Sequence, residues 1–217
     1  MTAPLSRQDD IERIAAALAQ AAALVGRYTP GLVAARRKAG GDPVTEADTE
    51  LDALLRRLLP RPGEGWLSEE TEDDPARLAC ERVWVVDPLD GTREFVLGLP
   101  EWAISIGLIE AGEAVAGGIC NPATGETFLG ARGLGVTVNG QPARVGSRSL
   151  LSGARVLASR SEVRRGEWQS PSPPSYELLP MGSVAYKLAL VAAGLADATW
   201  TLSPKHEWDV AAGVALV

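Results

Sequence analysis

The chain has 217 residues, 46% of them apolar, and a formal net charge of −7 at pH 7. These values predict one large domain or two small lobes around a substantial core, and they exclude wholesale disorder. The acidic balance argues against binding a nucleic-acid polymer, whose phosphates require a basic face. No stretch is apolar enough to span a membrane, and acidic residues stand where a secretory signal needs a basic flank, so we expect a cytoplasmic protein without a membrane partner.

The N-terminal part of the chain predicts two amphipathic helices. Ser6 begins a capping-box pattern ahead of apolar residues at helical spacing, and Gly26 ends that helix. A basic segment at 36–38 is expected to form a loop. Thr45 then begins a second helix with its leucines on one face, and Pro60 stops it.

The central part of the chain predicts a mostly antiparallel sheet. A short strand at 66–68 precedes an acidic run, and the segment 83–86 is an apolar strand. Two longer strands are expected at 102–109 and 114–120. Turn signals between 121 and 140 indicate shorter strands after them.

The composition shifts near residues 147–152, and this shift predicts an N-terminal α+β lobe at 1–147 and a C-terminal α/β lobe at 148–217. The second lobe alternates strand and helix, with elements expected at 155–158, 184–193, 198–202 and from about 209 onward, and with a Pro/Ser-rich loop at 170–175. Two helices, a mostly antiparallel sheet and an alternating segment together predict a layered α+β fold.

Cysteine and histidine are too sparse to carry the chemistry. Cys80 and Cys120 are isolated, so we expect free thiols in a reducing compartment. His206 is the only histidine, with no cysteine nearby and no GxSxG elbow in the chain, which weakens zinc sites of the His/Cys type and serine-nucleophile chemistry. The chemistry therefore has to come from carboxylates, hydroxyls and metal ions.

The segment 84–92 is the most informative. An apolar strand leads into Asp87 and Asp90, three residues apart, and the chain then breaks at a glycine. Two carboxylates and the Leu89 carbonyl that converge on one point form a hard-cation site of the kind Mg²⁺ prefers. The alternative is a strand that ends in an Asp-rich turn, with Gly91 present for its positive φ. These residues alone leave both interpretations open.

Five acidic residues share one context, since each stands at the end of a predicted strand or the start of a helix: Asp48, Glu69, Asp87, Asp90 and Asp209. Singly, each has an ordinary explanation as a helix cap or a solvated acid. If they converge, each pair at about 4 Å repels by roughly 4 kcal/mol at an effective dielectric near 20. Such a cluster requires protons or cations, and oxygen-only ligands suit Mg²⁺ or Mn²⁺.

The chain resembles the Mg²⁺-dependent, lithium-sensitive phosphatase superfamily of inositol monophosphatases and 3′(2′),5′-bisphosphate nucleotidases. Four motifs carry the resemblance in family order, at 42–48, 68–71, 84–92 and 208–213. The resemblance implies a layered α-β-α-β-α sandwich, a metal-dependent phosphoric monoester hydrolase and a possible homodimer. Family members continue past the helix near Asp209, so the C-terminal lobe is expected to be truncated.

The resemblance also implies residue roles. Glu69, Asp87 and the Leu89 carbonyl would hold a first ion, while Asp87, Asp90 and Asp209 would hold a second. Glu69 would assist a weaker third, so two to three Mg²⁺ or Mn²⁺ ions are expected. Thr92 and Asp48 would orient and deprotonate the attacking water, with Glu69 also counted as catalytic. The expected substrate contacts are Gly91, Thr92, Arg93, Gly182, Ser183 and Lys187.

The expected partner is a small phosphorylated substrate, a nucleotide bisphosphate or an inositol phosphate. The segment 90–95 resembles the bisphosphate nucleotidases, while 98–106 is closer to the inositol phosphatases. The leading interpretation is a nucleotidase that converts adenosine 3′,5′-bisphosphate to AMP and phosphate, with Lys187, Lys205 and Arg93 near the second phosphate. The alternative is an inositol-1-monophosphatase or related sugar-phosphate phosphatase. A non-catalytic metal-binding relative is a rival of another class, and the intact set of acidic residues argues against it.

Overall fold

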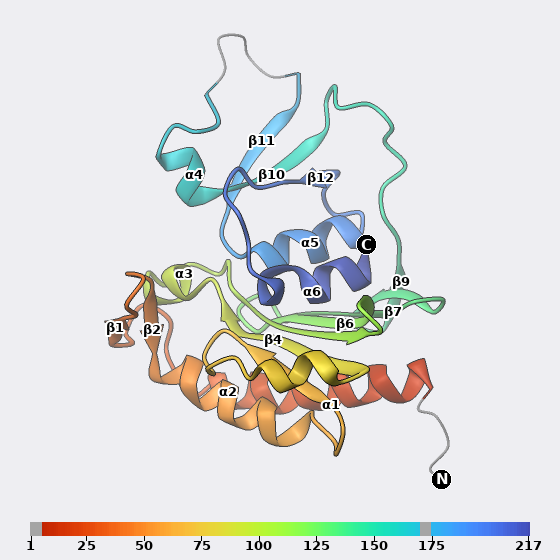
Figure 1. Cartoon of the computed structure of the whole chain (residues 1–217). Helices are drawn as coiled ribbons and strands as arrows, with labels where there is room; N and C mark the ends of the chain where they lie inside the picture. The colour runs from red at the N-terminus through yellow and green to blue at the C-terminus, as the bar shows by residue number, and fades with distance from the viewer. Residues whose placement is uncertain (1–5, 170–174) are drawn as a thin grey trace.

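A computed structural model describes residues 6–169 and 175–217 of the chain. The elements stack in layers, with two helices, a seven-stranded sheet, two further helices and a three-stranded sheet following one another (Figure 1). The prediction of a layered α+β fold is confirmed. Apart from Ser175, the predicted loop at 170–175 lies outside the described residues.

Helices α1 (Arg7–Val25) and α2 (Glu46–Leu58) form the first layer, and both were predicted. Each begins with a capping box, at Ser6 and at Thr45. Such a box satisfies backbone N–H groups that have no partner within the helix. The helices bury their apolar faces in the main core together with side chains from the large sheet.

The basic segment predicted as a loop is instead a strand. β1 (Ala35–Arg37) pairs antiparallel with β2 (Pro43–Thr45) in a small hairpin. The Lys38 N–H donates to the Asp42 carbonyl oxygen at 2.8 Å and closes the hairpin, with Gly41 in the left-handed region at φ +90°. The pairing of these two short strands was not predicted from the sequence.

The large sheet has the strand order β3-β4-β5-β6-β7-β8-β9. Within this sheet the β3–β4 pair is parallel and the other five pairs are antiparallel, which agrees with the predicted mostly antiparallel sheet. A short 3₁₀ helix, η1 (Pro75–Ala79), connects β3 to β4 and was not predicted. The strands are β3 (Gly65–Ser68), β4 (Arg82–Asp90), β5 (Ala103–Glu110), β6 (Glu113–Asn121), β7 (Glu126–Ala131), β8 (Gly135–Val138) and β9 (Gln141–Ala143).

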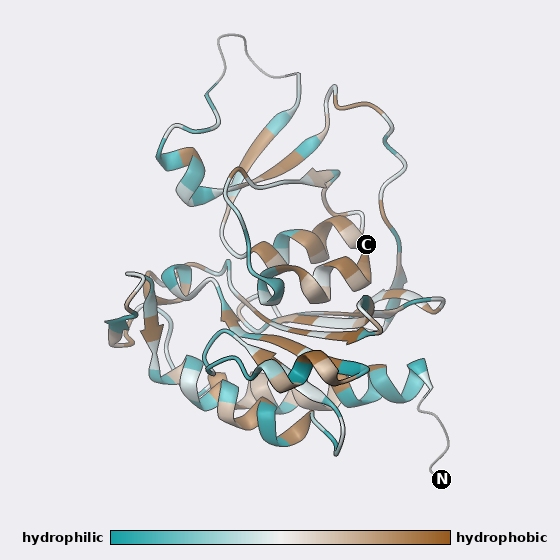
Figure 2. Cartoon of the chain, viewed as in Figure 1, coloured by the Kyte–Doolittle hydropathy of each residue, from teal (hydrophilic) through white to brown (hydrophobic). Residues whose placement is uncertain are grey.

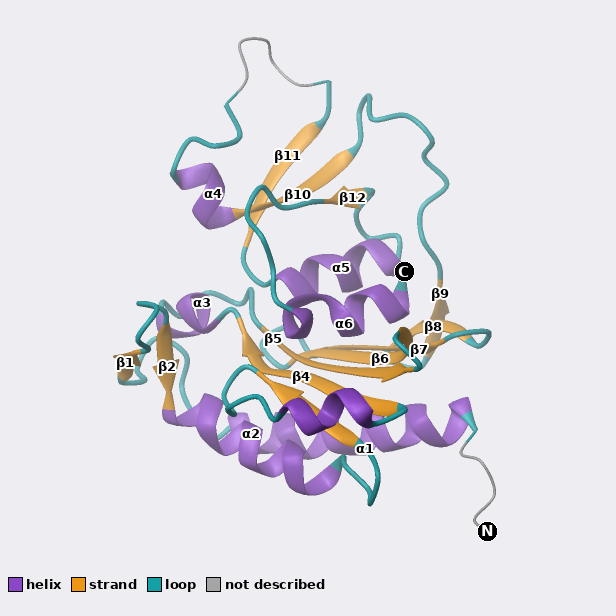
Figure 3. Cartoon of the chain, viewed as in Figure 1, coloured by secondary structure: helices purple, strands orange, loops and turns teal. Residues whose placement is uncertain are grey.

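The C-terminal part adds a parallel sheet of order β11-β10-β12. Its strands are β10 (Arg155–Ser159), β11 (Glu177–Met181) and β12 (Ala198–Thr199), and its helices are α4 (Arg160–Arg164), α5 (Val184–Ala192) and α6 (Glu207–Leu216). Neither α4 nor β11 was predicted from the sequence, and β12 is shorter than the strand expected at 198–202. Figure 3 shows α5 and α6 between the two sheets. The lobe boundary at 147/148 stays a prediction.

Helix α6 lies close against the large sheet because two sheet positions are glycines. A Cβ atom at Gly117 would lie 2.5 Å from the Ala212 carbonyl oxygen, and one at Gly107 would lie 2.8 Å from the Ala211 Cβ. Figure 2 shows hydrophobic residues on the central strands and on α5 and α6, where these layers meet. This close packing fixes the start of α6 relative to the end of β4.

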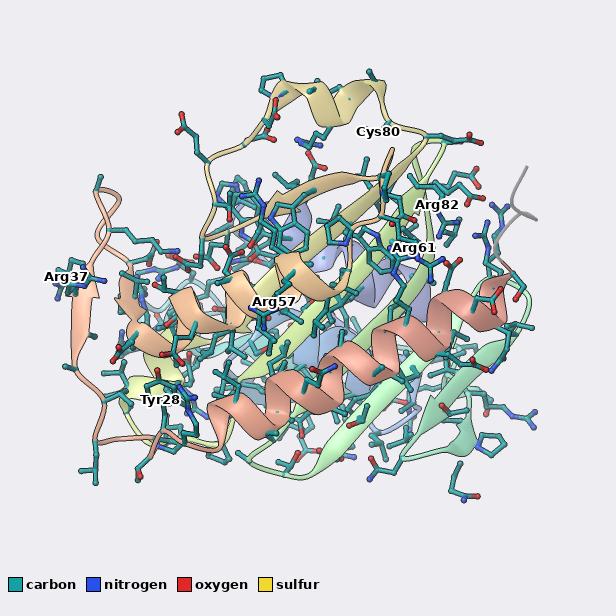
Figure 4. The ribbon with its side chains drawn as sticks, turned by 90° about the horizontal axis from the view of Figure 1, so that it is seen from below. Tyr28, Arg37, Arg57, Arg61, Cys80 and Arg82 are labelled. Atoms are coloured by element: carbon teal, nitrogen blue, oxygen red, sulfur yellow. The ribbon has the colours of Figure 1, made fainter. Side chains whose placement is uncertain are left out.

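A network of ion pairs joins α1, β4 and β5 at one end of the sheet. Arg82 Nη1 lies 2.6 Å from Glu110 Oε2, and Arg7 also pairs with Glu110. Both arginines contact Asp10, whose side chain is almost fully buried. Figure 4 shows Arg82 from below, beside α1. Hydrogen bonds from Arg7, and then from Arg82, lower the pKa of Glu110 to about 2 although burial opposes the shift.

We expect Glu110→Gln to destabilise the fold by about 1 kcal/mol at pH 7, a value reduced for the partial exposure of these side chains. The folded-state pKa lies below the ordinary 4.5, so the stabilisation is complete above pH 4.5 and is lost as the pH falls toward 2. Urea unfolding of both proteins at pH 7 and pH 3 measures this, with the difference smaller at pH 3. Glu113→Gln, in an exposed pair with Arg132, is the matched control and should change little.

Cys80 and Cys120 are both free thiols, as predicted. Among the helices of residues 6–169 and 175–217, none combines the length and apolar character needed to cross a bilayer.

Candidate active site

Strand β4 presents two carboxylates where its pairing with β5 becomes irregular. Asp87 lies opposite Ser105 and Asp90 opposite Ala103, with a register shift between them. The strand was predicted to end at residue 86 and to be followed by a turn, whereas β4 continues to Asp90. The Leu89 N–H donates to Asp87 Oδ1 at 3.0 Å within the irregularity. The chain therefore presents both carboxylates in the same small region.

The residue after β4 has to be glycine. Gly91 has φ +99°, and a Cβ there would lie 2.8 Å from the Glu101 carbonyl oxygen. Helix α3 (Thr92–Val96) begins directly after it. Both the left-handed backbone and the close approach exclude a larger side chain, so Gly91 fixes the direction in which Thr92 leaves the strand.

Helix α6 supplies the third carboxylate. Asp209 lies in its first turn, where Oδ2 accepts a hydrogen bond from the His206 N–H at 2.8 Å. Carboxylate oxygens of Asp87, Asp90 and Asp209 all lie within 4.8 Å of one another. The structure thus brings together three of the residues singled out from sequence, two of them buried and one partly exposed.

Electrostatics show that this cluster fits a cation. Burial, followed by repulsion from Glu69, Asp90 and Asp209, raises the pKa of Asp87 well above its usual value. Burial also raises the pKa of Asp90 to about 6, although hydrogen bonds from the Ser183 hydroxyl and the Ala185 N–H oppose the shift. The protein alone therefore disfavours ionising all three. Hard divalent ions such as Mg²⁺ match this oxygen-only donor set.

Glu69 lies close enough to raise the pKa of Asp87, but its carboxylate is paired with a lysine. Lys38 Nζ lies 2.6 Å from Glu69 Oε1 and 2.7 Å from Glu70 Oε1. Lys38 follows β1 and reaches across from the hairpin. The contact between Lys38 and Glu69 was not predicted, because no local sequence pattern connects positions 38 and 69.

Asp48 combines two roles that the sequence presented as alternatives. Its Oδ2 accepts hydrogen bonds from the Thr45 N–H at 2.8 Å and the Thr45 hydroxyl at 2.6 Å, which caps α2. Its Oδ1 accepts a hydrogen bond from the Thr92 hydroxyl at 2.8 Å. Burial raises the pKa of Asp48, while the Thr45 and Thr92 hydroxyls oppose the shift. The helix cap and the predicted catalytic acceptor are therefore the same carboxylate.

A pocket of about 470 Å³ opens over these groups. Every residue predicted for the site lines it except Asp48, which contacts it through Thr92. The lining comes from the end of β4, from α3, from the segment before α5 and from the start of α6. His206, the α6 N-cap, also lines the pocket and stacks on Trp208 with ring centroids 4.5 Å apart.

The predicted substrate contacts differ in whether their polar groups already have partners within the protein. Arg93 is half-exposed and pairs with Asp42 at 2.6 Å. The Ser183 hydroxyl donates to Asp90, and the Gly182 N–H donates to Glu101 at 2.7 Å, so both groups support the site. Lys187 is 3% exposed, and burial lowers its pKa. The role of these residues in binding substrate stays a prediction.

Asp52 also supports the site, although it was not predicted from the sequence. Asp52 accepts hydrogen bonds from the Ser68 and Thr71 hydroxyls, each at 2.5 Å, and so holds both ends of the segment that contains Glu69. Asp52 follows Asp48 by one helical turn, and residues at that spacing share a helix face. This i, i+4 relation was the available signal.

Comparisons with known proteins agree in the kind of protein they match. The model of the "Inositol monophosphatase family" matches residues 7–217. An inositol-1-monophosphatase from Rhizobium meliloti is 36% identical over 189 residues, covering 83% of this chain and 70% of the relative. A fructose-1,6-bisphosphatase/inositol-1-monophosphatase from Thermotoga maritima is 32% identical over 81% of this chain and 68% of its own length. The crystal structure of the extragenic suppressor protein suhB from Bartonella henselae has a TM-score of 0.81 at 30% identity, covering 96% of this chain and 83% of the other.

Proposed function

The chain belongs to the inositol monophosphatase family, and on that premise we propose that it hydrolyses inositol 1-phosphate or a related sugar phosphate with the help of divalent metal ions. Members of this family are phosphoric monoester hydrolases, so the chain is an enzyme of that class. Several of the relatives are named inositol-1-monophosphatases, which supports the alternative given by the sequence over the leading nucleotidase interpretation. Dimerisation and a cytoplasmic location stay predictions.

The observation that carries the proposal is the hydrogen bond from Thr92 to Asp48 beside the three-carboxylate cluster. We propose that Asp87, Asp90, Asp209 and the Leu89 carbonyl hold the metal ions, with Glu69 contributing once Lys38 releases it and keeps only its pair with Glu70. Divalent ions supply a lowered pKa for a bound water and neutralise charge on phosphate oxygens.

The protein's own groups then handle the water and its proton. The Thr92 hydroxyl donates its hydrogen to Asp48, so its oxygen can accept a hydrogen bond from a water in the pocket. This contact orients the water for attack on phosphorus in line with the leaving oxygen. Thr92 passes the proton to Asp48, whose raised pKa suits it as an acceptor. The phosphate is transferred directly to water, without a covalent enzyme intermediate.

A substrate panel tests the proposal. We expect purified protein to release phosphate from inositol 1-phosphate in Mg²⁺, to lose this activity in EDTA and to be inhibited by Li⁺. The kcat/KM for inositol 1-phosphate should exceed those for adenosine 3′,5′-bisphosphate and fructose 1,6-bisphosphate by about tenfold or more, a ratio within reach of a few specific contacts. Full activity in EDTA would contradict the mechanism. A preference for the adenosine compound would instead support the nucleotidase interpretation.

A further inference from the structure

Glu162, on α4, is a buried carboxylate outside the metal cluster with an unusual number of donors around it. Its Oε1 accepts hydrogen bonds from the Thr201 hydroxyl at 2.8 Å and from the N–H groups of Leu202 and Ser203 at 3.1 and 3.2 Å. Its Oε2 accepts one from Trp168 Nε1 at 2.9 Å. The residue is 1% exposed. Burial raises the pKa of Glu162, but these hydrogen bonds outweigh burial and lower it overall.

These hydrogen bonds hold the segment that connects β12 to α6. Within residues 6–169 and 175–217, α4 is the one helix or strand that hydrogen-bonds to the backbone of 202–205, where the Thr201 hydroxyl also bonds to Ser203. The same segment brings Pro204, Lys205 and His206 to the pocket wall. Figure 1 shows it crossing from β12 to the start of α6. The position of Lys205 in the pocket therefore depends on contacts made by Glu162.

The charges around Lys205 favour an anionic ligand. Lys205 is exposed to the pocket, and it lies near enough to the buried Lys187 to help lower that lysine's pKa, after burial itself. Asp90, Glu162 and Glu94 act in the opposite direction on Lys187. Two ammonium groups on one side of a pocket repel each other, and a bound anion relieves that repulsion. Glu162 supplies part of the balancing charge when no anion is bound.

We propose that Glu162 is a positioning residue, which holds residues 202–205 so that Lys205 contacts the phosphorylated substrate beside Lys187. The nature of that substrate rests on the proposed function. The effect should fall on substrate binding, because α6 packs directly on the sheet and Asp209 takes its hydrogen bond from the α6 N-cap. Chemistry at the carboxylate cluster should change little.

The test uses Glu162→Gln, Lys205→Ala and the double variant. Glutamine replaces one carboxylate oxygen of Glu162 with an NH2 group, which cannot accept hydrogen bonds from the surrounding N–H and O–H donors. The segment 202–205 should therefore be held less firmly. Each single change should raise the KM for inositol 1-phosphate about tenfold with kcat within about threefold, and the double variant should be no worse than either, because both remove one interaction. Glu167→Gln, an exposed neighbour paired with Arg165 at 2.5 Å, is the matched control and should change neither constant.

Hydrogen exchange provides a readout independent of turnover. The Leu202 and Ser203 amides should exchange at least about tenfold faster in Glu162→Gln but not in Lys205→Ala. Additive effects of the two changes on KM would contradict the proposal, as would faster exchange with an unchanged KM. If Glu162→Gln does not fold, Thr201→Val removes the hydroxyl that donates to Glu162 and contacts the Ser203 backbone, and it should raise the KM by about two- to fivefold, consistent with the loss of one or two hydrogen bonds.

The proposed function and this inference can fail separately. If the wild-type protein releases no phosphate from any substrate, the proposed function fails. Binding of inorganic phosphate, measured by calorimetry in Mn²⁺, then still tests Glu162, because Glu162→Gln and Lys205→Ala should weaken it alike. Equal phosphate affinity in all the variants would overturn the positioning role.

Discussion

Asp87→Asn is expected to abolish turnover and, without divalent cations, to make the fold more stable. Asp87 lies at the centre of the carboxylate cluster, and losing one charge should cost several kcal/mol of transition-state stabilisation, or at least about a thousandfold in kcat. In EDTA the same change removes a buried carboxylate whose pKa is raised by burial and by repulsion from the neighbouring acidic residues. Relief of that cost should raise stability by about 1 kcal/mol or more, roughly 2–4 °C in Tm for a chain of this size.

Three measurements check this result: phosphate release, Mn²⁺ binding by calorimetry and thermal unfolding in EDTA. Mn²⁺ binding should weaken strongly while Tm rises. Asp73→Asn, at an exposed aspartate paired with Arg77 outside the pocket, is the matched control and should leave activity intact. An Asp87→Asn protein with unchanged turnover, or one destabilised in EDTA, would show that the cluster is not the metal site we describe.

Thr92→Val is expected to lower kcat by about 10²- to 10⁴-fold, the range that general acid–base groups contribute. Valine keeps the shape of threonine but removes the hydroxyl that donates to Asp48 and faces the pocket. The carboxylates of the cluster are untouched, so Mn²⁺ affinity should stay within about twofold, well under 1 kcal/mol. This pattern separates handling of the water from holding of the metal.

Single-turnover phosphate release and Mn²⁺ calorimetry on the Thr92→Val protein make that separation. Thr124→Val provides a matched control, because its hydroxyl also donates to a carboxylate, that of Glu126 at 2.7 Å, and neither residue lines the pocket. The control should keep wild-type kcat. If Thr92→Val turned over normally, the proton route through Asp48 would have to be abandoned.

Much of the fold was predictable because its signals are local. The capping patterns at Ser6 and Thr45 lie within three residues, and β5 and β6 are long apolar strands around a recognisable turn. The missed elements include β1, β2, β11, η1, α3 and α4, which have three to five residues each. Elements that short depend on partners elsewhere in the chain, and a single sequence does not display those partners.

The residues of the site also fall into those that could be predicted from the sequence and those that could not. Asp87, Asp90 and Asp209 were predicted to converge because their motifs matched a family, and the structure brings them together. The supporting contacts were not foreseen, since Lys38 lies 31 residues from Glu69 and Ser183 lies 93 residues from Asp90. The motifs therefore predicted the acidic residues of the site. The side chains that pair with these acids or orient them could be identified only from the three-dimensional structure.

The hydrogen bonds on Asp90 have a consequence for how the molecule holds together. Asp90 belongs to the large sheet, yet Oδ2 is bound by Ser183 and Ala185 at the start of α5, at 2.7 and 2.6 Å. Asp209 approaches the same point from α6. An ion bound there would link the large sheet to helices α5 and α6. The affinity for the ion and the stability of the packing between the large sheet and these helices would then be coupled, so a change that weakens one would weaken the other.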